Sequence, residues 1–417
     1  MLQTLIPIVF VLALLLIASD WLHRTVIVLA GAALFVLLGA LDQEQAFAAI
    51  DLDTLGLLIG MMIIVTITER TGIFEQLAIM AMRLSKGRPL AVVALMVTIT
   101  AVLSAFLDNL TSILLIAPIT IIVASKFGMP PVPLLIMQII ASNIGGTATL
   151  VGDPPNIMIA GATGLSFNAF LINLAPISFL ALIVVCGVLY ATRRSQFRGH
   201  GNTVDLQDMQ AEVPLATGRA LWLPLGILGA TIVAFFVHGA LGLEPATVAL
   251  VGAAAMLLSG VAPLDETLSR IDWPTLFFFG GLFVMVGGLE QIGFIDSIAA
   301  ATKDLTAGSR PAEIFAIMGI AALGSAFVDN IPFTAAMIPV VEQLNEANDD
   351  SYWWALSLGA CFGGNATIIA AAANVACQGV AERHGVRITF REFLKWGVPA
   401  TLMSLAIAAA FIWAVHL

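Results

Sequence analysis

Four short polar clusters interrupt the apolar stretches of this 417-residue chain. Two of them begin with an Asp-Asn pair, at Asp108-Asn109 and Asp329-Asn330. The other two begin with a Gly-Gly pair and end at an asparagine ten positions after the second glycine. Carboxylates, amides and hydroxyls at such breaks can bind a small polar solute or an ion. The candidate binding residues are Asp108, Asn109, Thr111, Gly145, Gly146, Thr147, Thr149, Asp153, Asn156, Asp329, Asn330, Thr334, Gly363, Gly364, Asn365, Thr367 and Asn374.

Each cluster also has a purely structural interpretation. Asp108 and Asp329 could cap the helices that follow them, because Asp is a preferred N-cap residue. The glycines could be packing residues, since small residues are common where membrane helices meet. An ionised carboxylate inside a membrane is costly, however, which favours a role for both aspartates as proton or cation carriers. Asp153 could carry a coupling proton, help to bind a cation, or be a turn residue.

The clusters belong to an internal repeat. A shift of 221 positions places the first Asp-Asn pair on the second, and a shift of 218 places Asn156 on Asn374. Asp153 is an exception, because its counterpart is Ala371. An internal repeat in a very apolar chain is typical of a transporter built from two related halves around a central site.

The composition is that of a polytopic membrane protein. Apolar residues make up 60% of the chain, charged residues only 11%, and the mean hydropathy is +1.02. A soluble domain carries roughly a quarter charged residues. The sequence has no basic arm for nucleic acid, no nucleotide-binding glycine loop and no paired Cys or His of a metal site. We therefore expect neither an enzyme nor a cofactor, and no nucleic-acid partner.

Apolar runs and basic residues together predict the topology. The runs 90–124 and 311–345 are interpreted as re-entrant hairpins. The positive-inside rule then places all of the 17 Lys and Arg residues except Lys303 and Arg310 on the cytoplasmic side, and both termini outside. We expect an all-α polytopic protein of two inverted repeats, each with five transmembrane helices and one hairpin, in the lipid bilayer. The expected ranges are 1–192 for the first repeat, with a broken helix at 132–165; 193–220 for a cytoplasmic linker; and 221–417 for the second repeat, with a broken helix at 353–383.

The segments around the clusters resemble a known superfamily. AFLDNLTSILLIAPITIIVA (105–124) and ASNIGGTATLVGDPPNIMIAG (141–161) are similar to those of the ion-transporter superfamily, and most of all to its branch of arsenite permeases (ArsB), NhaD-type sodium/proton antiporters and P proteins. Divalent anion:sodium symporters belong to the same superfamily. The resemblance covers the whole chain and implies an elevator-type transporter, in which a mobile transport domain bearing the hairpins moves against a scaffold domain. It also implies a homodimer, as in the symporter branch.

The residues and the resemblance together predict a secondary transporter for proton-coupled efflux of arsenite or antimonite across a bacterial inner membrane. A neutral hydroxide gains little from the membrane potential, so exchange for inward protons would drive its export. Exchange of Asp108 or Asp329 for asparagine is then expected to abolish coupled transport and leave the fold intact.

Other functions remain open from the sequence. One is Na+/H+ antiport of the NhaD type, with Na+ as the coupling ion. A dicarboxylate symporter is less favoured, because an aspartate at each hairpin tip repels an anionic substrate. A channel, or a membrane subunit powered by a separate soluble ATPase that docks on 193–220, would be a different class.

Overall fold

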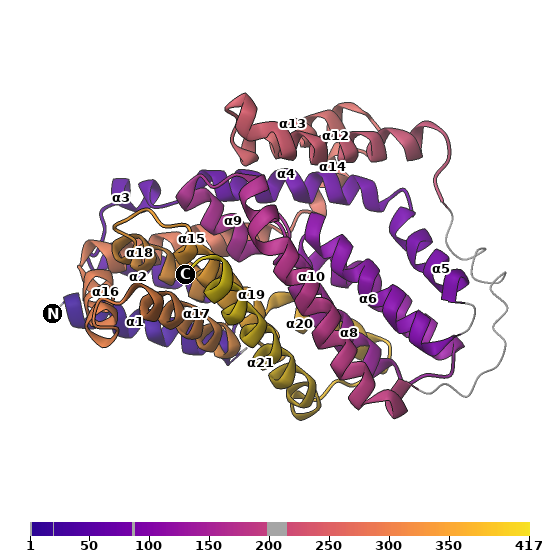
Figure 1. Cartoon of the computed structure of the whole chain (residues 1–417). Helices are drawn as coiled ribbons and strands as arrows, with labels where there is room; N and C mark the ends of the chain where they lie inside the picture. Colours follow the sequence, from indigo (N-terminus) through magenta and orange to yellow (C-terminus); the bar gives the residue numbers. More distant parts are fainter. Residues whose placement is uncertain (1, 20, 86–87, 198–214) are drawn as a thin grey trace.

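The described part of the chain is helical. The computed structural model describes residues 2–19, 21–85, 88–197 and 215–417, and all the regular secondary structure within these ranges is helical (Figure 1). Most of the expected linker 193–220 lies outside the described residues. The helices of the first half are α1 (Leu2–Ala18), α2 (Arg24–Leu37), α3 (Gln43–Ala48), α4 (Leu52–Glu69), α5 (Ile73–Ser85), α6 (Pro89–Phe106), α7 (Asn109–Lys126), α8 (Pro131–Gly146), α9 (Pro154–Thr163), α10 (Phe167–Thr192) and the 3-10 helix η1 (Arg194–Phe197). Those of the second half are α12 (Arg219–Leu241), α13 (Pro245–Leu258), α14 (Leu264–Ser269), α15 (Trp273–Gln291), α16 (Phe294–Leu305), α17 (Arg310–Phe327), α18 (Asn330–Leu344), α19 (Ser351–Gly363), α20 (Ala372–Arg383) and α21 (Phe390–Val415).

The helix bounds of the two halves correspond. α13 and α17 begin and end 221 positions after α2 and α6, and α21 begins and ends 223 positions after α10. These are the offsets at which the sequence repeats. The inverted orientation of the halves, and the division into scaffold and transport domains, stay predictions.

The protein is a multi-pass membrane protein. Of the described helices, α4, α7, α10, α12, α15, α17 and α21 are long and apolar enough to cross a membrane. By contrast, α2 and α13 are apolar but have only 14 residues each, fewer than the roughly 20 that a hydrocarbon core needs. The helices α7 and α17, each expected to be one arm of a hairpin, have 18 residues. Which segments re-enter instead of crossing stays a prediction.

The helices break at the polar clusters. α6 ends one residue before Leu107-Asp108, and α17 ends one residue before Val328-Asp329. In the other two clusters, α8 and α19 end at glycines, and seven and eight residues follow before α9 and α20 begin, respectively. Pro154 suits the first turn of α9, because its missing N–H has no helical partner there. We call Asp108-Asn109 and Asp329-Asn330 the first and second tip, and the segments 147–153 and 364–371 the two unwound segments.

One glycine of each Gly-Gly pair lets two helices approach closely. A Cβ atom at Gly363 of α19 would lie 2.6 Å from the carbonyl oxygen and 2.8 Å from the Cα of Ala322 in α17. At Gly145 of α8 a Cβ would collide in the same way with the backbone of Ala101 in α6. Each glycine thus holds the start of an unwound segment against the first arm of a predicted hairpin.

Gly363→Ala is therefore expected to lower the free energy of unfolding by about 2 kcal/mol, because the added methyl overpacks a backbone contact. Gly364→Ala is the matched control, since its Cβ would come no closer than 3.1 Å to Cys361 O. Thermal unfolding of the detergent-solubilised protein measures both. An equal loss of stability in the two variants would contradict the close approach at Gly363.

Candidate functional site

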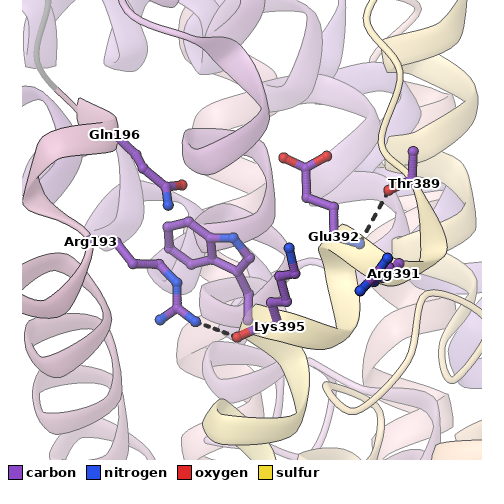
Figure 2. A pocket seen from close by; sticks show the side chains of 7 residues that line it. Arg193, Gln196, Thr389, Arg391, Glu392 and Lys395 are labelled. Atoms are coloured by element: carbon purple, nitrogen blue, oxygen red, sulfur yellow. Dashed lines mark hydrogen bonds between the residues drawn. The ribbon is translucent and has the colours of Figure 1, made fainter.

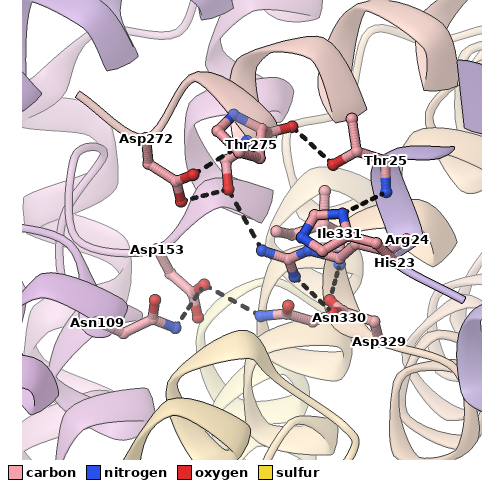
Figure 3. Close-up of polar contacts among 11 residues, drawn as sticks. His23, Arg24, Thr25, Asn109, Asp153, Asp272, Thr275, Asp329, Asn330 and Ile331 are labelled. Atoms are coloured by element: carbon pink, nitrogen blue, oxygen red, sulfur yellow. Dashed lines mark hydrogen bonds and ion pairs between the residues drawn. The ribbon is translucent and has the colours of Figure 1, made fainter. Parts of the chain in front are cut away.

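Asp153 lies where the two tips meet an unwound segment (Figure 3). Its Oδ1 accepts hydrogen bonds from the Nδ2 of Asn109 at 3.1 Å and from the Nδ2 of Asn330 at 3.0 Å. The side chain is fully buried. Although Asp153 precedes α9 directly, its carboxylate does not cap this helix. A residue present in one half only therefore joins elements of both halves.

The second oxygen of Asp153 is the less satisfied one. Within the described residues Oδ2 has no hydrogen-bond partner of normal geometry. The thiol of Cys361 lies beside the carboxylate, but a thiol is only a weak donor. Because buried polar atoms are nearly always paired, an acceptor left free in this position is expected to have a functional reason.

The tip aspartates both act as caps. Asp108 accepts from the backbone N–H of Thr111 at 2.8 Å and from its hydroxyl at 2.6 Å, at the start of α7. Asp329 accepts from the N–H of Ile331 at 3.0 Å, at the start of α18. Capping alone does not account for Asp329, whose other oxygen pairs with Arg24 of α2.

Arg24 is a site residue that the sequence analysis missed. Its Nη1 lies 3.3 Å from Oδ2 of Asp329, and its Nη2 donates to Thr275 Oγ1 at 3.3 Å. The guanidinium also lies over the ring of Phe278, 5.2 Å from its centre. Arg24 and Asp329 line a cavity of about 330 Å³ together with Leu110, next to the first tip. One tip therefore has a cationic partner, whereas no ion pair of Asp108 is found among the described residues.

A second missed residue, Asn143, connects the amides of the site. Its Nδ2 donates to Oδ1 of Asn365 and Oδ1 of Asn374, both at 3.1 Å. Its Oδ1 lies 3.5 Å from the Nδ2 of Asn109, at the limit of a hydrogen bond. The Nδ2 of Asn365 has no partner among the described residues and is buried. The site thus contains an unpaired donor as well as the unpaired acceptor of Asp153.

Asn156 and Asn374 fasten the two unwound segments. The Nδ2 of Asn156 donates to the carbonyl of Thr149 at 2.8 Å, and that of Asn374 to the carbonyl of Thr367 at 2.9 Å. The Oδ1 of Asn156 accepts from Ser357 Oγ at 2.6 Å. Both amides are occupied by protein groups in this structure, so their predicted contact with a solute would require these bonds to open.

Most of the remaining candidate residues form hydrogen bonds to the backbone around the tips and the unwound segments. Thr149 and Thr367 donate to carbonyls at the ends of α6 and α17, those of Ala105 and of Ala326, the latter at 2.7 Å. The hydroxyl of Thr334 bonds back to the carbonyl of Asn330 at 2.7 Å. The other members of the predicted set lie within the same network or beside it, namely Thr111, Thr147, Gly145, Gly146, Gly363 and Gly364.

A model of one protein family matches residues 14–359, and its description is citrate transporter (CitMHS). This chain belongs to the citrate transporter family. It is therefore a membrane transporter of small solutes, and the expectation of a transporter is confirmed at this level. The family's description names citrate for the family as a whole.

Relatives from other organisms agree with this assignment. A protein of Mycobacterium tuberculosis described as an uncharacterized transporter is 40% identical over 97% of this chain and 96% of its own length. The 46 kDa membrane protein of Mycobacterium leprae is 39% identical, with 97% of each chain covered. The human P protein is 31% identical over 96% of this chain, which spans only 58% of that longer protein. The similarity to P proteins predicted from the sequence is thus confirmed.

The fold also has a solved counterpart. The YdaH transporter of Alcanivorax borkumensis, described as having an unusual topology, matches 91% of this chain and 88% of its own with a TM-score of 0.61. Its sequence identity is 16%, so this likeness concerns the fold alone. The citrate transporter family member described here is accordingly an all-helical polytopic transporter with a YdaH-like fold.

Proposed function

We propose that this family member is a proton-coupled secondary transporter that exports a neutral, trivalent hydroxide of arsenic or antimony across a bacterial inner membrane. The observation that carries the proposal is Asp153, a fully buried carboxylate that binds both tips with one oxygen, while its other oxygen has no partner of normal geometry and only the weak donor Cys361 beside it. An acid in such a position is suited to exchange a proton during transport.

Asp153 would couple the proton to the tips through its charge. When the carboxylate is ionised, its bonds from Asn109 and Asn330 are charge-assisted and roughly twice as strong as neutral ones. Protonation weakens both bonds at once and frees the tips to move relative to the unwound segment. In the elevator movement that the superfamily implies, this loosening would precede the transfer of the solute.

The chemistry of the site favours a neutral solute that both donates and accepts hydrogen bonds. Asp153 offers an unpaired acceptor and Asn365 an unpaired donor. Three aspartates lie at or beside the tips, and Arg24 pairs with only one of them. The negative charge of the other two aspartates would repel a multiply charged anion, whereas it would not repel a neutral hydroxide of arsenic or antimony.

Two observations support other substrates. Carboxylate oxygens without a cationic partner, as in Asp108, would also suit Na+ in a sodium/proton antiporter. The family description and the Arg24 guanidinium, exposed by 23% and lining a cavity of about 330 Å³, favour an organic anion such as citrate. We place the neutral solute first because it alone would use both the unpaired acceptor of Asp153 and the unpaired donor of Asn365: a cation has no use for the donor, and an anion has none for the acceptor.

Everted membrane vesicles that contain the protein, loaded with a pH-sensitive dye, test the proposal. After energisation, arsenite, Na+, Li+ and citrate are added in turn, and vesicles without the protein serve as the control. Proton release on arsenite alone supports the proposal. Release on Na+ or Li+ identifies a cation antiporter, and proton uptake on citrate identifies a symporter, either of which rejects arsenite as the substrate.

A further inference from the structure

A basic pocket lies outside the candidate site, at the ends of two long helices. α10 and α21 have 26 residues each and lie side by side, with the end of α10 near the start of α21 (Figure 1). Between these ends opens a pocket of about 520 Å³ (Figure 2). Arg193, Arg391 and Lys395 line it, with Glu392 as the one carboxylate among the described lining residues.

The positive charge of this pocket is not balanced by the protein. In the part of the chain that the structure describes, none of its three cations forms an ion pair. Arg193 donates to the carbonyl of Lys395 and lies over the ring of Trp396, 4.5 Å from its centre. Burial lowers the pKa of the Arg193 guanidinium. Three cations without ion pairs around one pocket, with Arg193 held against Trp396, favour an anionic ligand.

An apolar groove on the same face of α10 leads toward the pocket. It has a volume of about 300 Å³ and is lined by α6, α8 and α10. The α10 residues that line it include Phe179, Ile183, Cys186 and Tyr190, which are spaced three or four positions apart. Arg193 follows three positions after Tyr190. Residues three or four apart share one face of a helix, so this stripe runs from the groove into the basic pocket.

Aromatic rings connect the two hollows. The ring centres of Tyr190 and of Phe197 in η1 lie 5.2 Å apart. The ring centres of Phe197 and Trp396 lie 5.9 Å apart. The stripe from Phe179 to Arg193 extends about 21 Å at the helical rise per residue. One leaflet supplies about 15 Å of hydrocarbon and a headgroup layer beyond it. The dimensions therefore match one acyl chain and its headgroup.

We infer that the pocket and the groove together bind an anionic phospholipid. Its phosphate would lie among Arg193, Arg391 and Lys395, and one acyl chain would occupy the groove between α6 and α10. Basic pockets between membrane helices on the cytoplasmic side are known to bind such headgroups, and the sequence predicts this side to be cytoplasmic. A free phosphate would use the pocket but would leave the groove unused. A lipid in this place links α6, the first arm of a predicted hairpin, to α10.

The charge of the pocket is tested by native mass spectrometry of the purified full-length protein with added phosphatidylglycerol or phosphatidylcholine. We expect phosphatidylglycerol to bind about tenfold more tightly. Lys395→Gln should weaken this binding about fivefold, in line with the contribution of one basic residue. Arg194→Gln, which removes the same charge from an exposed residue that does not line the pocket, should leave it unchanged. Equal binding of both lipids to the wild-type protein overturns the inference.

The groove needs a test of its own, since a free anion would respond to the same charges. Gly187 lines the groove, and a Cβ atom there would meet no other atom within 4 Å, so Gly187→Phe is expected to place its ring in the groove. Gly226→Phe on α12, also in open space, is the matched control. We expect only Gly187→Phe to reduce lipid binding, by about tenfold. If lipid binding is unchanged in Gly187→Phe and inorganic phosphate displaces the lipid, the pocket is a site for small anions. This result would contradict the inference that the groove binds an acyl chain.

Discussion

Asp153→Asn is expected to reduce proton-coupled transport to the level of vesicles without the protein, while the protein still folds. Asparagine keeps the volume of the side chain, and its Oδ1 can still accept from Asn109 and Asn330. The free energy of unfolding should change by no more than about 1 kcal/mol, the contribution of a typical hydrogen bond. Asparagine cannot take up a proton, however, so the step that links the proton to the tips is lost.

The decisive comparison is between two kinds of flux. Solute counterflow, which needs no net proton movement, should persist in Asp153→Asn, whereas dye-detected proton exchange should disappear. Asp265→Asn in α14, an exposed residue far from the tips in sequence, is the matched control and should retain both. Full proton exchange in Asp153→Asn would remove this residue from the coupling mechanism.

The sequence predicts the parts of the site that occur twice. The paired clusters locate both tips and both unwound segments, because the polar residues recur at fixed offsets within apolar runs. Asn143 and Arg24 do not recur: their counterparts by the same offsets are Cys361 and Pro245. A pattern based on repetition therefore passes over the residues that make the two halves of the site unequal. In the sequence analysis Arg24 is one of the basic residues that the positive-inside rule places on the cytoplasmic side, so it does not stand out as a site residue.

Hydrogen bonding is the other part that the sequence leaves undetermined. Asn156 and Asn374 are apparent as polar residues in both halves, yet only the three-dimensional arrangement shows their amides bound to the unwound segments. Asp153 is equally compatible in sequence with a turn and with a coupling residue. What separates these alternatives is where its carboxylate bonds: it makes no capping bond to α9 and accepts instead from the asparagines of the two tips (Figure 3). This bonding depends on contacts across 177 positions of sequence, from Asp153 to Asn330.

Arg24→Gln is expected to impair transport strongly and to be rescued by a second change, Asp329→Asn. The ion pair joins α2 to the second tip, with Arg24 exposed by 23% and Asp329 by 7%. Loss of the cation leaves a nearly buried carboxylate without a partner. The cost should be about 2 kcal/mol, less than for a fully buried pair because Arg24 retains contact with solvent. Asp329→Asn alone leaves Arg24 unpaired beside the site and should be impaired as well.

The double variant distinguishes two roles of Asp329. If its carboxylate serves to hold Arg24, the Arg24→Gln/Asp329→Asn protein contains no unpaired charge, and both its stability and its transport should return toward the wild-type values. If Asp329 itself carries the proton, the double variant regains stability but stays inactive. We expect recovery of both, because Asp329 already has a cationic partner, whereas Asp153 has an oxygen free for the proton.

An ion pair at the surface serves as the reference for the coupling free energy of Arg24 and Asp329. Arg70 and Glu266 join α4 to the start of α14 with side chains exposed by 27% and 40%. Such a pair contributes about 1 kcal/mol or less, so Arg70→Gln should change stability little and transport not at all. A coupling free energy for Arg24 and Asp329 no larger than that of the Arg70 pair would mean that the contact at the second tip is incidental. A larger coupling, seen in transport as well as in unfolding, would place Arg24 with Asp153 among the residues that make one half of this transporter different from the other.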